Sequence, residues 1–250
     1  RYLRSDLRIQ AVDETAKAAS SYAVDISAYF QGEEQSYGDV DGRWRAGMII
    51  QNLGPKIKYD ESGRETFLPT NLRLGTGFDF LLDQYNKVSV TAEFAKLLVP
   101  TPPILGYEYN FTDNNDNGVY DEGIDELGEQ TTGELVVYNG QTTNVDFLQG
   151  VFQSFSDAPG GFSEELKEFT WALGAEYVYD DSFALRAGYF NESEDKGARK
   201  FLALGAGFKF SGTRVDLSYL FSASRVPSPL ENTLRFSLTF DFGSNSYLEY

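Results

Sequence analysis

Three runs near the C-terminal end decide the fold: KFLALGAGFKF (residues 200–210), RVDLSYLF (214–221) and NTLRFSLTFDF (232–242). Large apolar residues alternate in them with small or polar ones. Because side chains point to opposite faces of a strand with period two, each run predicts a strand with one apolar and one polar face. Each is roughly ten residues long, the length that a tilted strand needs to cross a bilayer. The pattern therefore predicts a transmembrane antiparallel β-barrel.

Alternation is also typical of a soluble β-sandwich, which turns its apolar face inward, and this alternative stays open. Three features favour the barrel. The strands are uniformly long, whereas soluble strands usually run to about 5–6 residues. The apolar face is rich in large aromatic residues, and the opposite face carries charge and glycine, as a polar barrel interior does.

Composition excludes several classes of function. The 250 residues include 21 Lys+Arg against 38 Asp+Glu, for a net charge of −17, so we expect no nucleic-acid partner. The chain has neither Cys nor His, which removes disulfides, thiol chemistry, His-ligated zinc and Ser-His-Asp catalysis. No nucleotide-binding or hydrolase motif occurs. We therefore expect a protein that is not an enzyme.

Six further strands are predicted upstream, at about 22–30, 44–50, 70–82, 88–98, 168–179 and 182–190. Short turns alternate with longer segments, as the periplasmic turns and extracellular loops of outer-membrane barrels do. The whole of 1–250 is thus expected to be one outer-membrane barrel domain, with a long extracellular loop at about 99–167. Bacterial barrels normally have an even number of strands. A count of about nine indicates either the C-terminal part of a barrel whose first strands are missing or a miscounted strand.

The acidic stretch DNNDNGVYDEGIDE (113–126) lies inside the long loop and resembles a calcium-binding loop. Side-chain oxygens recur at the spacing that wraps a hard cation, Gly118 permits a sharp turn, and the twelfth position holds Ile124 in place of the usual Glu. The alternative is a solvated acidic turn without an ion. The predicted Ca²⁺ ligands are Asp113, Asn115, Asn117, Val119 (through its carbonyl oxygen) and Asp121; no other cofactor is expected.

Apolar residues also occur in the long loop, where they would need cover. They would either fold over the barrel mouth or bind another protein, and the pattern does not choose. The predicted partner-binding residues are Val136, Val137, Phe147, Leu148, Val151, Phe152 and Phe155. On the polar face of the strands, salt-bridge ladders inside the barrel are expected from Glu93, Glu176, Arg186, Asp216 and Arg235.

Three longer stretches carry a resemblance to a known family. They are FLPTNLRLGTGFDF (67–80), AGYFNESEDKGARKFLALGAGFKF (187–210) and VDLSYLFSASRVPSPLENTLRFSLTFDF (215–242). They resemble the PorV family of the Bacteroidetes type IX secretion system, which has a FadL-like barrel of 14 strands. The resemblance implies that this chain is the C-terminal part of such a barrel, located in the bacterial outer membrane.

The resemblance also implies function and partners. PorV-like proteins receive cargo from a SprA-like translocon, recognise the cargo's C-terminal signal domain and shuttle it to a PorU-like sortase; membrane lipid surrounds the barrel. Two alternatives remain: a FadL-like transporter of hydrophobic small molecules, and a structural or adhesive surface barrel with a calcium-braced loop.

Overall fold

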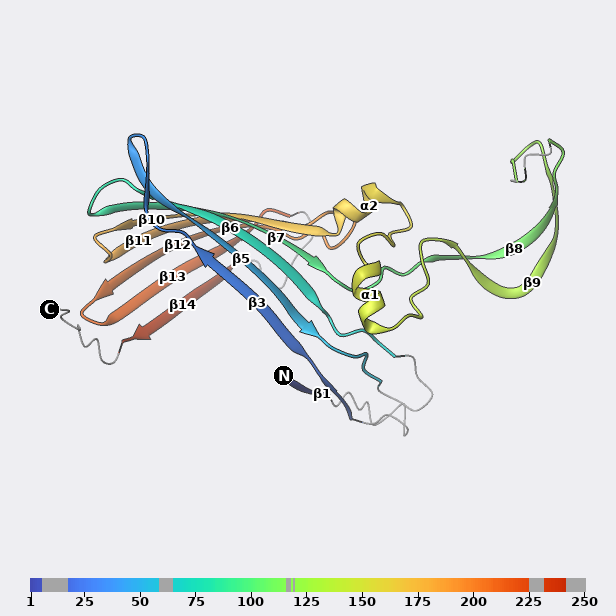
Figure 1. Cartoon of the computed structure of the whole chain (residues 1–250), viewed down its shortest axis with the longest axis horizontal. Coiled ribbons are helices and arrows are strands. Elements are labelled where there is room, and N and C mark those ends of the chain that lie inside the picture. The colour runs from blue at the N-terminus through green and yellow to red at the C-terminus, as the bar shows by residue number, and fades with distance from the viewer. Residues whose placement is uncertain (6–17, 59–64, 116–117, 119, 225–231, 242–250) are drawn as a thin grey trace.

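The computed structural model describes residues 1–5, 18–58, 65–115, 118, 120–224 and 232–241 (Figure 1). Its main element is one antiparallel sheet in the order β14-β13-β12-β11-β10-β7-β6-β5-β3, with β4 paired to β5. The bounds are β3 (Val24–Gln31), β4 (Gln35–Tyr37), β5 (Val40–Leu53), β6 (Asn71–Leu81), β7 (Asn86–Leu97), β10 (Phe169–Tyr179), β11 (Phe183–Asn191), β12 (Lys200–Phe210), β13 (Thr213–Ser222) and β14 (Thr233–Phe240).

The all-β prediction is confirmed, whereas barrel closure is not seen. Across the described residues the main sheet is open, and β3 and β14 are its two edges. The strands expected from alternation correspond to strands of this sheet, except that Tyr22 belongs to β2 and that Phe242, the predicted end of the last strand, lies outside the described residues. The short strand β4 was not expected: it turns back onto β5 at Gly38, whose φ of +77° suits glycine.

Two smaller sheets are not hydrogen-bonded into the main one. β1 (Tyr2–Ser5) pairs with β2 (Ala19–Tyr22), and β8 (Ile104–Thr112) pairs with β9 (Glu126–Asn139). Two short helices follow β9, namely α1 (Phe147–Gln153) and α2 (Phe162–Lys167). The predicted long loop at 99–167 therefore contains both a hairpin and two helices.

The strand register separates the two faces of the main sheet. Trp44 lies opposite Phe78, Phe78 opposite Val90, and Val90 opposite Ala175, which makes a continuous apolar row. The adjacent row of paired residues, whose side chains point to the opposite face, consists of Arg45, Gly77, Thr91, Gly174 and Gly188. One face is thus mainly apolar, with Lys96 on it at the end of β7, and the other is mainly small or polar, with the Phe190–Phe201 pair as an exception, as alternation broadly predicts.

The apolar face has no second layer over it. Within the described residues, strands of this sheet contact their neighbours in the sheet, and α2 contacts β10. Trp44 and Phe94 are each 51% exposed. A sandwich would bury such a face against another sheet. The soluble-sandwich alternative is therefore not the architecture of the described chain.

The connections differ at the two ends of the strands. Tight turns close one end, as at Asp180-Asp181, where both residues have positive φ in the manner of a two-residue hairpin turn. The long segments, including α1, α2 and the β8–β9 hairpin, lie at the other end (Figure 1). Among the helices described, none is both long enough and apolar enough to cross a membrane.

Candidate functional site: the segment between β7 and β10

The β8–β9 hairpin projects away from the main sheet (Figure 1). Its pairing has three register shifts, between Ile104/Leu105, Tyr107/Tyr109 and Tyr109/Phe111. These irregularities, together with the polar run EQTT in β9, break the alternation that reveals the other strands. Sequence reasoning missed the hairpin for that reason.

The hairpin exposes apolar side chains to solvent. Leu105 pairs with Val137, Tyr107 with Leu135, and Phe111 with Leu127. All six are exposed, and Tyr138 is 80% exposed. An isolated two-stranded hairpin is marginally stable in water. An uncovered apolar surface of this kind typically marks a binding surface.

The charged side chains of the segment are almost all acidic. No Lys or Arg occurs between Lys96 and Lys167, whereas the same stretch contains many Asp and Glu residues. Much of the chain's net charge of −17 is therefore concentrated here. A partner that bound this surface would best present basic side chains around an apolar centre.

The acidic stretch forms the far end of the hairpin. The Asp113 carboxylate accepts hydrogen bonds from the Asn115 N–H (3.2 Å) and the Gly118 N–H (2.6 Å). Asn115 Nδ2 donates to Asp121 Oδ2 at 2.7 Å. Three predicted ligands are thus brought together, while Asn117 and Val119 lie outside the described residues. Calcium at this position stays a prediction.

The predicted partner-binding residues fall on two elements. Val136 and Val137 lie in β9; Phe147, Leu148, Val151 and Phe152 lie in α1, and Phe155 follows it. Phe152 is 74% exposed, and Phe147 and Val151 are half-buried. The structure therefore leaves most of this set accessible to a partner.

Helix α2 adds two apolar residues that sequence reasoning missed. Phe162 and Leu166 are exposed, whereas Glu165 between them is buried. Positions i and i+4 share one face of a helix, so this spacing was the available signal. We call α1, α2 and the residues between them (147–167) the cap.

An ionic cluster joins the cap to the sheet. Lys96 of β7 is fully buried, and its Nζ lies 3.1 Å from Glu165 Oε2 and 2.5 Å from Glu168 Oε2. Thr101 donates through its hydroxyl to Glu168 (2.6 Å) and through its N–H to Asp157 (3.0 Å). The cap is thus held by contacts to residues at and just beyond the end of β7.

The loop after β11 reinforces this cluster. Lys196 Nζ lies 2.6 Å from Glu164 Oε1 and 3.0 Å from Glu168 Oε1. Burial raises the pKa of Glu168, but hydrogen bonds from Lys96, Thr101 and Lys196 outweigh it and hold that pKa below its usual value. Burial raises the pKa of Asp157, and the nearby Glu165 and Glu168 add to the rise.

Part of the salt-bridge ladder expected on the polar face of the sheet is present. Arg186 of β11 lies 2.5 Å from Glu176 of the neighbouring β10 and 2.6 Å from Asp216 of β13, so one guanidinium spans from β10 across β12 to β13. Arg73 and Glu93 approach to 3.7 Å. Arg235 lies opposite Ser218 in the register.

A further ion pair on this face was not predicted. The Asp79 carboxylate lies 3.0 Å from Arg43 and 2.7 Å from Arg45, and it accepts a hydrogen bond from Ser89. Asp79 lies opposite Arg43 in the register of β5 and β6, so its ion pairs depend on how these two strands align. These paired charges line the polar face with fixed, partly buried ions.

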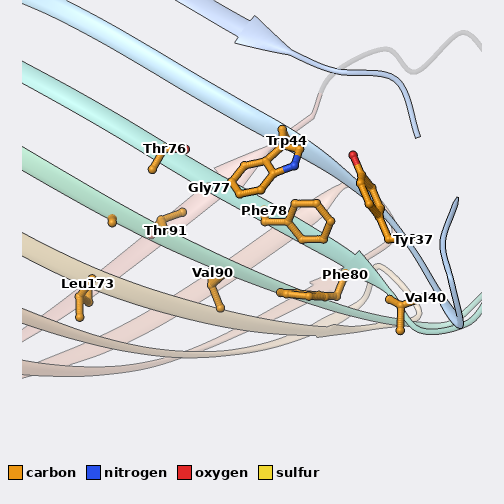
Figure 2. A pocket seen from close by; sticks show the side chains of 11 residues that line it. Tyr37, Val40, Trp44, Thr76, Gly77, Phe78, Phe80, Val90, Thr91 and Leu173 are labelled. Carbon is orange, nitrogen blue, oxygen red and sulfur yellow. The ribbon is translucent and has the colours of Figure 1, made fainter. Parts of the chain in front are cut away.

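The apolar face has one aromatic hollow of about 620 Å³, near the tight-turn end of the strands (Figure 2). Phe78 stacks edge-on against Trp44 (4.9 Å between ring centroids), Tyr37 (5.4 Å) and Phe80 (4.7 Å). Val90 and Leu173 continue the lining along the sheet. The hollow lies on the apolar face of the sheet, and its lining contains no residue of the cap.

Comparison with known proteins identifies one family. Residues 1–104 match the family model described as "Type IX secretion system protein PorV". The first of the three stretches that carry the resemblance (67–80) lies inside this match, and the other two lie beyond it. No curated protein matches the chain. The resemblance to the PorV family is thereby confirmed over residues 1–104, and it implies a role in type IX secretion.

Proposed function

We propose that the chain is a non-enzymatic outer-membrane component of the type IX secretion system. In this role it receives cargo from a SprA-like translocon, binds the cargo's C-terminal signal domain and passes it to a PorU-like sortase. The observation that carries the proposal is the PorV match together with an exposed, apolar and acidic segment between β7 and β10. That segment is the proposed binding surface.

The uncovered apolar face supports a place in the membrane. Its residues are large and exposed, and its strands β6, β7, β10 and β12 have 11 or 12 residues each. A tilted strand of this length crosses a bilayer. The opposite face carries the Arg186 and Asp79 ion pairs, which would be costly against lipid and suit a polar interior. Closure of the sheet into a barrel is part of this proposal.

The alternative is a FadL-like transporter of hydrophobic small molecules. Such a transporter needs an apolar path along the polar face of the sheet. Paired charges occupy that face, at Arg43, Arg45 and Asp79 and again at Glu176, Arg186 and Asp216. The aromatic hollow lies instead on the outer row. These positions favour the secretion role over the transporter.

The test is a mild-detergent purification of the full-length protein from its native outer membrane, with mass spectrometry of the proteins and lipids that accompany it. The proposal expects a SprA-like translocon, or cargo with C-terminal signal domains, in stoichiometric amounts. A barrel that carries bound lipid and neither class of protein would contradict it and favour the transporter.

A further inference from the structure

The ionic cluster beneath the cap contains more negative than positive charge. Four carboxylates meet there, from Asp157, Glu164, Glu165 and Glu168, and the ammonium groups of Lys96 and Lys196 face them. Four negative charges against two positive charges leave a net charge of −2. Buried charges of one sign are costly unless an opposite charge or a proton compensates them.

Asp157 is the least satisfied member. Its side chain has no exposed area. One carboxylate oxygen, Oδ2, accepts the Thr101 N–H, and Oδ1 is buried without a hydrogen-bond partner. A buried polar atom in this state requires an explanation, and an unseen ion is one of the accepted ones.

Asp157 also lies close to two other carboxylates. One oxygen each from Asp157, Glu165 and Glu168 lie within 4.8 Å of one another. Two oxygens on opposite sides of a calcium ion lie about 4.8 Å apart, twice the usual Ca–O distance of about 2.4 Å. The three oxygens are therefore near enough to share one ion.

We propose that Asp157, Glu165 and Glu168 bind a divalent hard cation, with Ca²⁺ as the best fit. All three ligands are carboxylate oxygens, which Ca²⁺ and Mg²⁺ prefer and which do not select zinc or copper. One divalent ion cancels the net charge of −2. Ca²⁺ suits the site better than Mg²⁺ because it tolerates the irregular geometry of a helix end and a loop.

Lys96 and the ion have complementary roles in this site. Lys96 Nζ bonds to Oε2 of both Glu165 and Glu168. The Ala158 N–H donates to Glu165 Oε1, and the Thr101 hydroxyl and Lys196 donate to Glu168 Oε1. The second lone pair of each Oε2 and the unpaired Asp157 Oδ1 are therefore the positions left for the ion. The ligands all come from residues 157–168, whereas Lys96 and Thr101 come from β7 and the residues after it. The ion orders the cap, and Lys96 attaches it to the sheet. This site is distinct from the acidic stretch at the hairpin end, and its existence does not depend on the secretion role.

The test uses the full chain in detergent, stripped with EDTA and titrated with Ca²⁺ by calorimetry and by thermal unfolding. Three proteins are compared: the wild type, Asp157→Asn in the cap cluster, and Asp121→Asn at the hairpin end. We expect Ca²⁺ to bind the wild type and Asp121→Asn and to raise their melting temperatures. Asp157→Asn should lose at least tenfold in affinity for the cap site, and its melting temperature should no longer respond to Ca²⁺.

Two results would overturn the proposal: a wild type that neither binds Ca²⁺ nor gains stability from it, or an Asp157→Asn variant whose binding equals that of the wild type. If Asp157→Asn does not fold, crystals of the wild type soaked in Mn²⁺ can show directly whether an ion binds at the cap cluster. Anomalous density between Asp157 and Glu165 would support the site. Anomalous density at the hairpin end alone would refute it.

Discussion

The main sheet and the segment between β7 and β10 differ in how regularly their strands pair and in whether their charged side chains have partners. In the sheet, the strands from β5 to β14 pair in a regular register, β3 has one shift at Val24/Ile26, and charges on the polar face meet partners such as Arg186 with Glu176 and Asp216. In the segment, the hairpin register shifts three times, no Lys or Arg occurs between Lys96 and Lys167, and apolar side chains are exposed. The sheet thus pairs its own polar groups and leaves one apolar face uncovered, whereas the segment leaves both apolar and acidic side chains exposed.

Removal of the β8–β9 hairpin is expected to have the largest effect. Pro103 and Gly140 lie next to each other at its base, where a Cβ added to Gly140 would come within 3.3 Å of Pro103 Cα. Residues 104–139 can therefore be replaced by a direct join. We expect the sheet to assemble normally, as judged by circular dichroism, and the secretion-system proteins to fall at least tenfold in the purified sample.

A matched control for this deletion lengthens the tight turn at Asp180-Asp181 by two residues at the opposite end of the strands. That variant should retain its partners. If the deletion retained them too, the hairpin would not be the binding surface.

A second variant tests how the two regions are joined. Lys96→Met keeps the length of the side chain and leaves the Glu165 and Glu168 carboxylates without their buried cation. Breaking a buried ion pair from one side typically costs about 3–5 kcal/mol. We expect faster proteolysis within residues 140–168 and a lower melting temperature.

Lys200→Met is the control, because Lys200 pairs with the exposed Glu194 and an exposed pair contributes about 0–1 kcal/mol. Equal proteolysis of the two variants would show that Lys96 does not fasten the cap.

A third variant probes the sheet itself. Arg186→Met removes the guanidinium that joins Glu176 to Asp216. Because these side chains are about one-third exposed, solvent screening reduces the effect, and we expect a loss of about 1 kcal/mol in the free energy of unfolding. Arg73→Met, whose partner Glu93 is half-exposed at 3.7 Å, should cost less. Chemical denaturation of both variants in detergent measures the difference, and the reverse order would contradict the ladder.

The smallest expected effect concerns pH. Hydrogen bonds from Arg199, at 2.6 Å and 2.7 Å, hold the pKa of Glu192 below its usual value despite burial. A lowered folded-state pKa means that the ionised carboxylate stabilises the fold above the usual Glu pKa, and that this stabilisation disappears as the pH falls through the lowered value. Amide exchange in residues 191–200, corrected for intrinsic rates, should rise on acidification. In Glu192→Gln the amide-exchange rate of these residues should already be raised at neutral pH and should change little on acidification. If this variant responded to acid as the wild type does, another titrating group would cause the effect.

The sequence predicted the sheet better than the segment, and the physical reason is periodicity. Alternation at Leu202, Leu204 and Phe208 reports directly on which face a side chain occupies, so strands and faces follow from it. The Arg186 ladder could be proposed because its members share the polar face. The Asp79 pairs could not, since they depend on register, which alternation fixes only to within two residues.

The segment was harder to predict because its contacts are long-range. Val136, Phe152 and Phe155 stood out as apolar residues in an acidic loop, and they are exposed as a partner-binding set would require. The Lys96 cluster had no local signal, since it brings β7 together with residues about 70 positions further along. Phe162 and Leu166 had only an i, i+4 spacing within a six-residue helix, too short a pattern to recognise.

The most direct measurement of the central claim is photo-crosslinking in the native outer membrane, with a photoreactive amino acid placed at Phe152 in the cap or at Leu217 on the apolar face of the sheet. Both side chains are exposed, so both probes can react. We expect the Phe152 probe to capture proteins of the type IX secretion system or their cargo, and the Leu217 probe to capture lipid. Lipid alone at Phe152, with secretion proteins captured at Leu217, would contradict the assignment of the segment between β7 and β10 as the binding surface.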